Sequence, residues 1–327
     1  MNRLYRIFCL VLLAGCASTP PSERPISATA RGPYAVDTSR ANFLDAKRGR
    51  DIPVRLYLPQ NAPGRRAVVI FSHGLANGAD GYRYLGEHWA SHGFVAVHLQ
   101  HHGSDIDLVR EKGLVALFKS TKDRKHWRDR PQDVTFILDM LESIEREETV
   151  DPFSTPVKGR IDFDRLVAAG HSYGAFTAAA LAGFLVDLKK EGGVTNFRDE
   201  RVDAAIMISM PKLEGATPQA WKAVKTSGLH ITGTRDRTLL FRTFLRHRRI
   251  PFEQITADNQ TLVVLEGATH STFSDDERRI SKRHAEYIHA TADATTLFLK
   301  SVLDSDAGAG EAYRTLGFPG LATVERH

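Results

Sequence analysis

The sequence predicts an α/β protein with a mostly parallel central sheet and helices on both faces of that sheet. Short, continuous apolar runs such as residues 67–71 and 94–99 are typical of strands that are buried on both faces. Between such runs lie amphipathic stretches such as residues 132–144, whose apolar residues recur at helical spacing. Strands that alternate with helices favour parallel pairing, and such sheets carry their chemistry at the carboxyl ends of the strands.

The elements follow one another along the chain without an internal repeat. Residues 41–58 alternate between apolar and polar, so we expect 50–58 to be an edge strand that pairs with the segment before it. Further strands are expected at 67–71, 94–99, 166–169, 204–210, 229–232 and 261–265, and helices at 81–91, 132–144, 175–188 and 285–303.

The N-terminus has the features of a secretion signal. Arg3 and Arg6 precede an apolar stretch at residues 7–13, which is too short to be a stable membrane span. Leu13-Ala14-Gly15-Cys16 resembles the bacterial lipoprotein box, which implies that Cys16 becomes the lipidated first residue. The alternative is an ordinary cleaved signal with an incidental cysteine.

A tether and one folded domain are expected to follow that signal. We expect residues 1–15 to be the signal peptide, 16–34 a flexible, proline-rich tether, and 35–327 a single α/β domain. In families with this box an Asp after the cysteine marks inner-membrane retention. Ala17 stands there instead, which favours the outer membrane, with the domain facing the periplasm of a Gram-negative cell.

Composition excludes several function classes. The formal net charge is +5, and subtracting Arg3 and Arg6 leaves +3, too weak a bias to indicate nucleic-acid binding. The chain has two cysteines, Cys9 and Cys16. One would be removed and the other lipidated, so the mature domain would have neither a disulfide nor a cysteine nucleophile.

A candidate nucleophile stands where an apolar run gives way to a helix-prone segment. Residues 170–174 read Gly-His-Ser-Tyr-Gly, directly after the strand expected at 166–169. A tight strand-to-helix turn favours glycine on both sides and exposes the hydroxyl of Ser172 at its tip. The amides at the start of the helix would stabilise an anion beside that hydroxyl.

A serine nucleophile needs a base and an acid that orients the base. Asp236 follows the strand at 229–232, and His270 follows the strand at 261–265, so the chain order is Ser, Asp, His. Glu214, after the strand at 204–210, is a rival orienting acid. The sequence therefore predicts a Ser172, Asp236 and His270 triad with one open alternative.

An oxyanion formed at Ser172 would need two backbone donors. The amide of Tyr173 follows the nucleophile, and the amide of Leu75 lies in the loop after the strand at 67–71. His73 in the same loop is expected to support it structurally.

These residues resemble the α/β-hydrolases, and among them the dienelactone-hydrolase-like and platelet-activating-factor-acetylhydrolase-like serine esterases. The resemblance covers about residues 50–305 and is carried by residues 71–75, 85–97, 102–105 and 170–174. It implies the α/β-hydrolase fold and the triad. True dienelactone hydrolases use cysteine as the nucleophile, and the acetylhydrolases place the acid one strand earlier, so neither family's substrate is implied.

Three other features have competing interpretations. His98, His101, His102 and Asp105 are expected to form a polar loop beside the cleft, with no metal site, because a matching second ligand set is missing. Residues 107–130 form an insert that is either a lid or membrane-facing helix, or a segment packed over the sheet. Residues 246–249, Arg-His-Arg-Arg, are expected to be a solvated helix end or, less favoured, to face anionic lipid.

The sequence thus predicts a lipid-anchored serine hydrolase that cleaves carboxylic esters through an acyl-enzyme and requires no cofactor. Small ester molecules and, through Cys16, the membrane are its expected partners, and the oligomeric state stays open. A peptidase or thioesterase with the same triad is one alternative, and a non-catalytic envelope lipoprotein that retains the fold is another.

Overall fold

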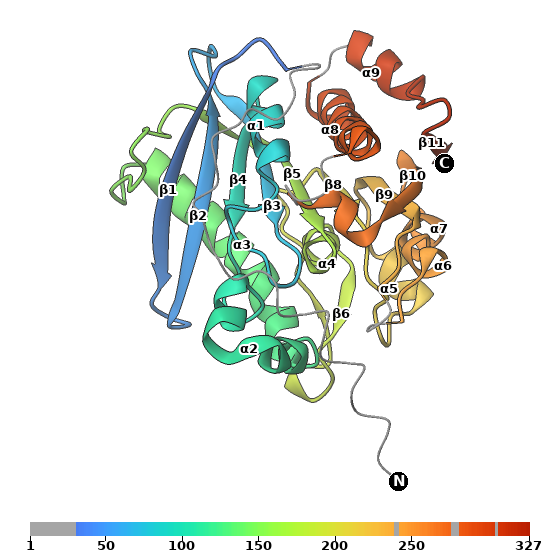
Figure 1. Ribbon diagram of the computed structural model, residues 1–327. Helices are drawn as coiled ribbons and strands as arrows, with labels where there is room; N and C mark the ends of the chain where they lie inside the picture. Colours follow the sequence, from blue (N-terminus) through green and yellow to red (C-terminus); the bar gives the residue numbers. More distant parts are fainter. Residues whose placement is uncertain (1–30, 239–241, 276–280, 305–306) are drawn as a thin grey trace.

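The centre of the protein is a mixed sheet, mostly parallel, with helices on both faces (Figure 1). The computed structural model describes residues 31–238, 242–275, 281–304 and 307–327. In sheet order, the strands of these residues are β1 (Val36–Asp45), β2 (Arg50–Pro59), β4 (Val95–Leu99), β3 (Arg66–Ser72), β5 (Ile161–His171), β8 (Ala204–Ile208), β9 (Ser227–Arg235), β10 (Gln260–Thr269) and β11 (Ala322–Arg326). The strands from β4 to β10 in this order are parallel, whereas β1, β2 and β11 pair antiparallel at the edges.

Each central strand buries both of its faces, which is why its sequence reads as a continuous apolar run. In β3, Val68 and Ile70 belong to one core cluster, whereas Val69 and Phe71 belong to the other. Successive side chains of a strand point to opposite faces, so both must be covered. Helices α3 (Arg124–Glu145), α4 (Tyr173–Leu181) and α5 (Pro218–Lys222) contribute to the first cluster, and α1 (Arg83–Ser91) and α8 (Lys282–Leu303) to the second.

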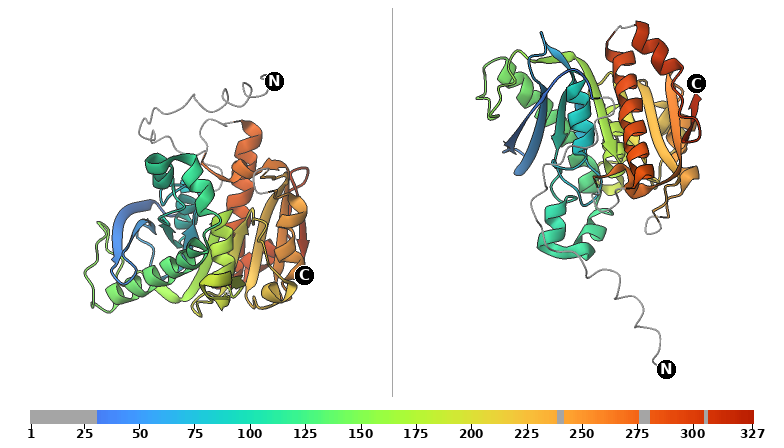
Figure 2. Two further views of the ribbon diagram at one scale, coloured as in Figure 1. Left: turned by 90° about the horizontal axis from the view of Figure 1, so that it is seen from below. Right: turned by 45° about the horizontal axis from the view of Figure 1, so that its top comes forward.

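The remaining elements lie around this frame. They are α2 (Ile106–Ser120), the hairpin of β6 (Leu185–Asp187) and β7 (Val194–Asn196), α6 (Leu245–Arg248), α7 (Ile250–Gln254), the short 3₁₀ helix η3 (His270–Phe273) and α9 (Ala307–Arg314). Seen from two further directions, α2 lies at the rim of the molecule, beyond the end of β4 that it follows (Figure 2).

The fold matches the predicted class, but several elements differ from their predicted bounds or were not predicted. The edge strand is β1, and the segment at 50–58 pairs with it as the second strand. The helix expected at 175–188 ends at Leu181, because Gly183 adopts a positive φ of 108° and the chain then enters β6. Strand β11 was not expected.

The order of the strands has a switch point at the middle of the sheet. The chain moves from β3 to β4 on one side and later returns to β5 on the other side of β3. The helices that follow β3 and β5 therefore cover opposite faces of the sheet, and in open α/β sheets ligands bind at the carboxyl ends of the strands at such a point. Because β3 pairs with β5, the loop at 72–77 lies beside the turn at 170–174.

The predicted signal peptide, Cys16 and most of the predicted tether lie outside the described residues. The described chain starts against α1, where the amides of Gly32 and Tyr34 donate to the hydroxyl and the carbonyl of Ser91, both at 3.0 Å. Among the described helices, none combines the length and the apolar character needed to cross a membrane.

Candidate active site

Ser172 stands at the tip of a sharp turn between β5 and α4. Its φ of 54° and ψ of −115° lie in a region that non-glycine residues rarely adopt. The amide of Ser172 donates to the carbonyl of Ile208 at 2.8 Å, which ties the turn to β8. Strain of this kind persists where the surroundings enforce it, and such positions are concentrated at functional sites.

The structure brings the three predicted triad residues together. Nε2 of His270 lies 3.0 Å from Oγ of Ser172, and Nδ1 of His270 lies 3.0 Å from Oδ1 of Asp236. Ser172 is half-buried, His270 is 26% exposed, and Asp236 is fully buried. The arrangement has an accessible hydroxyl, a base within hydrogen-bond reach and a buried acid behind the base.

Asp236 has donors on both carboxylate oxygens. Its Oδ2 accepts hydrogen bonds from the hydroxyls of Ser209 and Thr232, and its Oδ1 faces His270 and Arg248. Burial by itself would raise the pKa of this carboxyl, but the hydrogen bond from His270 and the charge of Arg248 outweigh it and lower the pKa. The acid is therefore held as a carboxylate.

Glu214, the rival acid, is exposed to solvent. It follows the neighbouring strand β8, whereas the hydrogen bond to Nδ1 of His270 comes from Asp236. The geometry thus favours Asp236.

The two predicted oxyanion donors come from segments that lie side by side. Gly174 packs so closely on the end of β3 that a Cβ placed on it would lie 1.8 Å from the carbonyl oxygen of Ser72. Only glycine allows this approach, which brings the first turn of α4, with the amide of Tyr173, against the loop that carries the amide of Leu75. Gly170 is needed for a similar reason, because its Cβ would lie 2.2 Å from the carbonyl carbon of Gly174.

Buried side chains hold this loop in place. The phenol of Tyr82 bridges the amide of Gly74 at 3.4 Å and Nδ1 of His171 at 2.8 Å. His73 is fully buried, with Nδ1 2.6 Å from the Gly74 carbonyl and Nε2 accepting from the amide of His101 at 3.0 Å. Burial and the nearby charge of Arg130 hold the pKa of His73 well below its ordinary value, so it is neutral. These contacts fit the structural role predicted for His73.

Arg130 links the loop to α4. Its guanidinium, 1% exposed, donates to the carbonyl of His73, to Oγ of Ser104 at 2.9 Å and to Oγ1 of Thr177 at 3.0 Å, and it lies over the ring of Tyr173 at 4.4 Å. Burial lowers the pKa of Arg130 to about 10, which still leaves it charged at neutral pH. One buried cation thus joins both segments that would supply the oxyanion donors.

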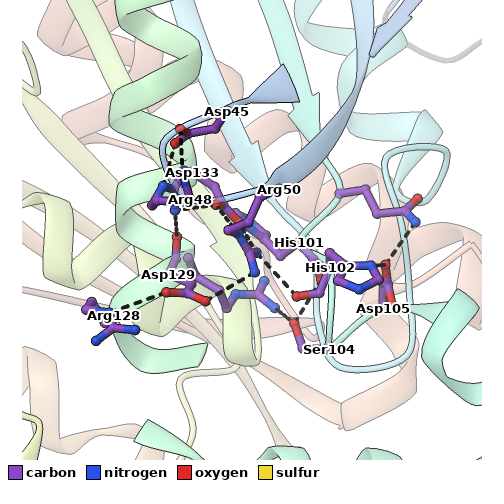
Figure 3. A network of polar contacts seen from close by, with 12 residues as sticks. Asp45, Arg48, Arg50, His101, His102, Ser104, Asp105, Arg128, Asp129 and Asp133 are labelled. Carbon is purple, nitrogen blue, oxygen red and sulfur yellow. Dashed lines mark hydrogen bonds and ion pairs between the residues drawn. The ribbon is translucent and has the colours of Figure 1, made fainter. Parts of the chain in front are cut away.

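A second series of serine, histidine and aspartate, formed by Ser72, His101 and Asp133, starts at the end of β3, and Figure 3 shows His101 and Asp133 in a polar network with Arg48 and Arg50. Nε2 of His101 lies 3.0 Å from Oγ of Ser72, and Nδ1 of His101 lies 3.1 Å from Oδ2 of Asp133. Asp133 also accepts from Arg50 on both oxygens, at 2.9 and 2.8 Å, and from Arg48 at 2.8 Å. Burial opposes the ionised form of Asp133, but His101 and Arg50 outweigh it and lower its pKa to about 2.

Burial distinguishes the two series. Ser72 is 2% exposed and ends a regular strand, whereas Ser172 is only half-buried and stands at a strained turn. An ester carbonyl has no access to Ser72. The second series therefore supports the loop after β3 and does not supply a nucleophile.

Sequence reasoning missed Arg130 and Asp133, although a signal was present. Both lie on the helical face that carries Val134, Ile137 and Leu141, where a polar residue must find a buried partner. Asp133 already lies inside the helix expected at 132–144. A start of α3 at Arg124, eight residues earlier than expected, would have placed Arg130 on the same face.

His98, His101 and His102 lie close together in the sequence but occupy different environments in the structure. His98 packs among aromatic rings, with its ring 4.7 Å from that of Phe71, His101 faces Asp133, and the side chain of His102 is 64% exposed. Within the described ranges, no group of three or more histidine, cysteine or acidic side chains is arranged to hold a metal ion.

The insert at 107–130 forms α2 and the first turns of α3. Helix α2 is interrupted at Gly113, which has a φ of 74°. A Cβ added at Gly113 would meet no other atom within 4 Å. Beyond this break, Leu114, Val115 and Phe118 are 42%, 68% and 38% exposed, while Leu117 is buried. The insert therefore does not simply pack over the sheet.

The expectation of a solvated helix end at 246–249 is wrong for Arg248. Arg246 is exposed, but Arg248 is 2% exposed and forms an ion pair with Asp236 at 2.8 Å. The sequence of a basic run does not show that one of its residues is buried, because only the tertiary fold determines which side chain points inward.

Comparison with known proteins adds no family assignment. No protein-family model matches this chain, and no curated protein matches it significantly.

Proposed function

We propose that the protein is a serine hydrolase of the α/β-hydrolase superfamily that cleaves carboxylic esters through an acyl-enzyme. The observation that carries this proposal is the continuous series from Ser172 through His270 to buried Asp236, with both links at 3.0 Å. It is supported by the strained turn at Ser172 and by the switch in strand order between β3 and β5, at whose carboxyl ends Ser172 lies.

The reaction follows from these positions. Oγ of Ser172 attacks the ester carbonyl carbon while Nε2 of His270 takes its proton, and the carbonyl oxygen becomes an oxyanion facing the amides of Leu75 and Tyr173. The C–O bond to the leaving alcohol then breaks, and His270 returns the proton to that oxygen. Water, deprotonated by His270, then attacks the acyl carbon. The bond from that carbon to Oγ of Ser172 breaks, His270 returns the proton to Oγ, and the carboxylic acid is released. Asp236 holds Nδ1 of His270 in the protonated tautomer throughout.

Three alternatives share the same fold. A thioesterase or peptidase would use the same triad, because acyl transfer to water does not depend on whether the leaving atom is oxygen, sulfur or nitrogen. A non-catalytic protein would keep the fold without the chemistry, and the close triad distances argue against it.

A fluorophosphonate probe and a panel of p-nitrophenyl esters test the proposal. We expect covalent labelling at Ser172 and hydrolysis that depends on acyl-chain length. The relative rates of hydrolysis of an ester, a thioester and an amide with the same acyl group distinguish an esterase from a thioesterase or a peptidase. An unlabelled, folded protein that hydrolyses none of these substrates would contradict the enzymatic proposal.

We also propose that Cys16 is lipidated and anchors the domain to the envelope, with the outer membrane as the favoured site. The proposal depends on Leu13-Ala14-Gly15-Cys16. Two or more acyl chains give stable membrane binding, whereas one gives only reversible binding. In a Gram-negative host, the full chain should fractionate with membranes, and Cys16→Ser should block lipidation. Mass spectrometry that finds an unmodified Cys16 in the mature N-terminus would exclude the anchor without affecting the esterase proposal.

A further inference from the structure

Arg130 holds the loop after β3 on both sides of Leu75, whose amide is one of the two proposed oxyanion donors. On one side, Nη2 of Arg130 donates to the carbonyl of His73. On the other side, Nη1 donates to Oγ of Ser104 at 2.9 Å, and the carbonyl of Ser104 accepts from the amide of Ala76 at 3.0 Å. Ala76 has a φ of 61°, a left-handed conformation that a non-glycine residue keeps where its surroundings enforce it. Leu75 therefore lies between two residues that Arg130 fixes, one directly and one through Ser104.

The same guanidinium fixes the first turn of α4, which carries the second donor. Nε of Arg130 donates to Oγ1 of Thr177 at 3.0 Å, and that hydroxyl donates to the carbonyl of Tyr173 at 3.3 Å. The guanidinium carbon also lies 4.4 Å from the centre of the Tyr173 ring, which is a cation–π contact. Each nitrogen of Arg130 thus binds to a group that holds one of the two donor segments.

The positions of these two amides matter because both are available to a ligand. Among the residues that the structure describes, the amide of Leu75 has no acceptor, and the amide of Tyr173, at the first position of α4, has none either. Donors stabilise an oxyanion best when they are in place before the reaction, since moving them during the reaction costs free energy. Gly174 lets the two segments approach each other, and the planar guanidinium, whose donors have fixed directions, sets their relative position.

We propose that Arg130 is a positioning residue that sets the spacing between the amides of Leu75 and Tyr173, so that both donate to one oxyanion. The proposal depends on the proposed esterase function and deepens it, because it names the group that assembles the oxyanion site. Arg130 is 1% exposed, so it acts through its contacts and does not touch the substrate.

The test compares the wild type, Arg130→Gln and Arg130→Lys in the hydrolysis of p-nitrophenyl acetate. Acylation and deacylation both pass through an oxyanion. In the Gln variant we therefore expect kcat to fall about 100-fold, the effect of losing one oxyanion donor, while KM changes by less than about threefold. Lysine keeps the charge without the planar set of donors, so its kcat should lie between the other two.

An alkyl trifluoromethyl ketone supplies a second measurement on the same three proteins. Oγ of Ser172 adds to its carbonyl carbon, and the hemiketal oxygen then faces the amides of Leu75 and Tyr173 as the oxyanion of the reaction would. The inhibition constant should rise in the Gln variant by about the factor by which kcat/KM falls, because both report binding of the same oxyanion.

Arg128→Gln is the matched control. Arg128 lies two residues away in α3, its side chain is 35% exposed, and it contacts Asp129 at 3.4 Å. This variant should keep the wild-type kcat and inhibition constant. A folded Arg130→Gln protein with the wild-type kcat, or with a lower kcat and an unchanged inhibition constant, would overturn the proposal, because Arg130 would then only stabilise the fold.

A second variant decides if Arg130→Gln does not fold. Valine in Thr177→Val has nearly the shape of threonine but accepts nothing from Nε of Arg130. We expect kcat to fall about tenfold at unchanged KM, equivalent to the loss of one hydrogen bond. An unchanged kcat in this variant would overturn the proposal.

Failure of the esterase proposal stays distinguishable from failure of this one. If the wild type hydrolyses no ester, the esterase proposal fails, and hydrogen exchange still tests the positioning. The amide of Ala76 should exchange faster in Arg130→Lys and Thr177→Val than in the wild type, whereas amides of β4 should not change. Equal exchange at Ala76 in all three proteins would refute the role of Arg130.

Discussion

Oγ of Ser72 lies 3.0 Å from Nε2 of His101, the same separation that joins Oγ of Ser172 to Nε2 of His270. Two series of serine, histidine and aspartate therefore start at the carboxyl ends of the neighbouring strands β3 and β5, and distance alone does not tell them apart. Solvent access distinguishes the two serines, because Ser72 is only 2% exposed.

The first prediction concerns which serine reacts. Fluorophosphonate should modify Ser172 alone, and Ser172→Ala should lower ester turnover by more than a thousandfold, because loss of such a nucleophile typically costs at least that much. Peptide mass spectrometry of the labelled protein identifies the site. Ser72→Ala is the matched variant: it should still be labelled at Ser172, even if its turnover falls. A probe adduct on Ser72 would contradict our assignment.

The second prediction concerns the acid. Asp236→Asn should lower kcat by about 10⁴-fold, because the amide favours the wrong tautomer of His270. Glu214→Gln, at an exposed position, should change kcat by less than twofold. Steady-state kinetics on one soluble ester is sufficient. The reverse ranking would assign the orienting role to Glu214.

The third prediction concerns Gly174. A methyl group there would lie 1.8 Å from the carbonyl of Ser72, so Gly174→Ala should separate α4 from the loop after β3. We expect lost activity together with a lower melting temperature. Gly310→Ala is the control, because Gly310 lies in α9 where an added Cβ would meet open space, and alanine favours helix by up to about 1 kcal/mol. Full activity in Gly174→Ala would show that the two segments need no such close contact.

The fourth prediction concerns acid stability. His230 is 2% exposed, with Nε2 3.0 Å from Oε1 of Gln260, and burial lowers its pKa to about 4 from an ordinary value near 6.5. Between these values the unfolded chain binds a proton that the folded chain does not. The free energy of unfolding must therefore fall as the pH drops from about 6.5 to about 4.

Replacing His230 should remove part of that dependence. Urea unfolding of His230→Gln at pH 7 and pH 5 should show a smaller difference between the two pH values than the wild type shows. His102→Gln, where the side chain is 64% exposed, serves as the comparison and should keep the wild-type difference. An undiminished difference in His230→Gln would mean that His230 is not held neutral by the fold.

Local patterns in the sequence determined the fold class and most of the strands. A strand buried on both faces must be apolar at every position, and residues 67–71 and 94–99 show this without reference to the rest of the chain. The turn at Ser172 is equally local, because its glycines and the change from strand to helix lie within a few residues. The triad of Ser172, Asp236 and His270 could be predicted from the sequence for the same reason, since each residue follows a strand that is recognisable in the sequence.

Only the tertiary structure decided which charged side chains turn inward. Arg248 sits in a basic run whose other members are at least partly exposed, and its burial depends on Asp236 and on the carbonyls of Ser209 and Met210, which lie 12 to 39 residues away. Ser72, His101 and Asp133 likewise meet only because β3, β4 and α3 pack together. A buried polar group is stable only where its partners are already in place. Those partners come from distant segments, so their meeting is a property of the packed fold and not of any local pattern.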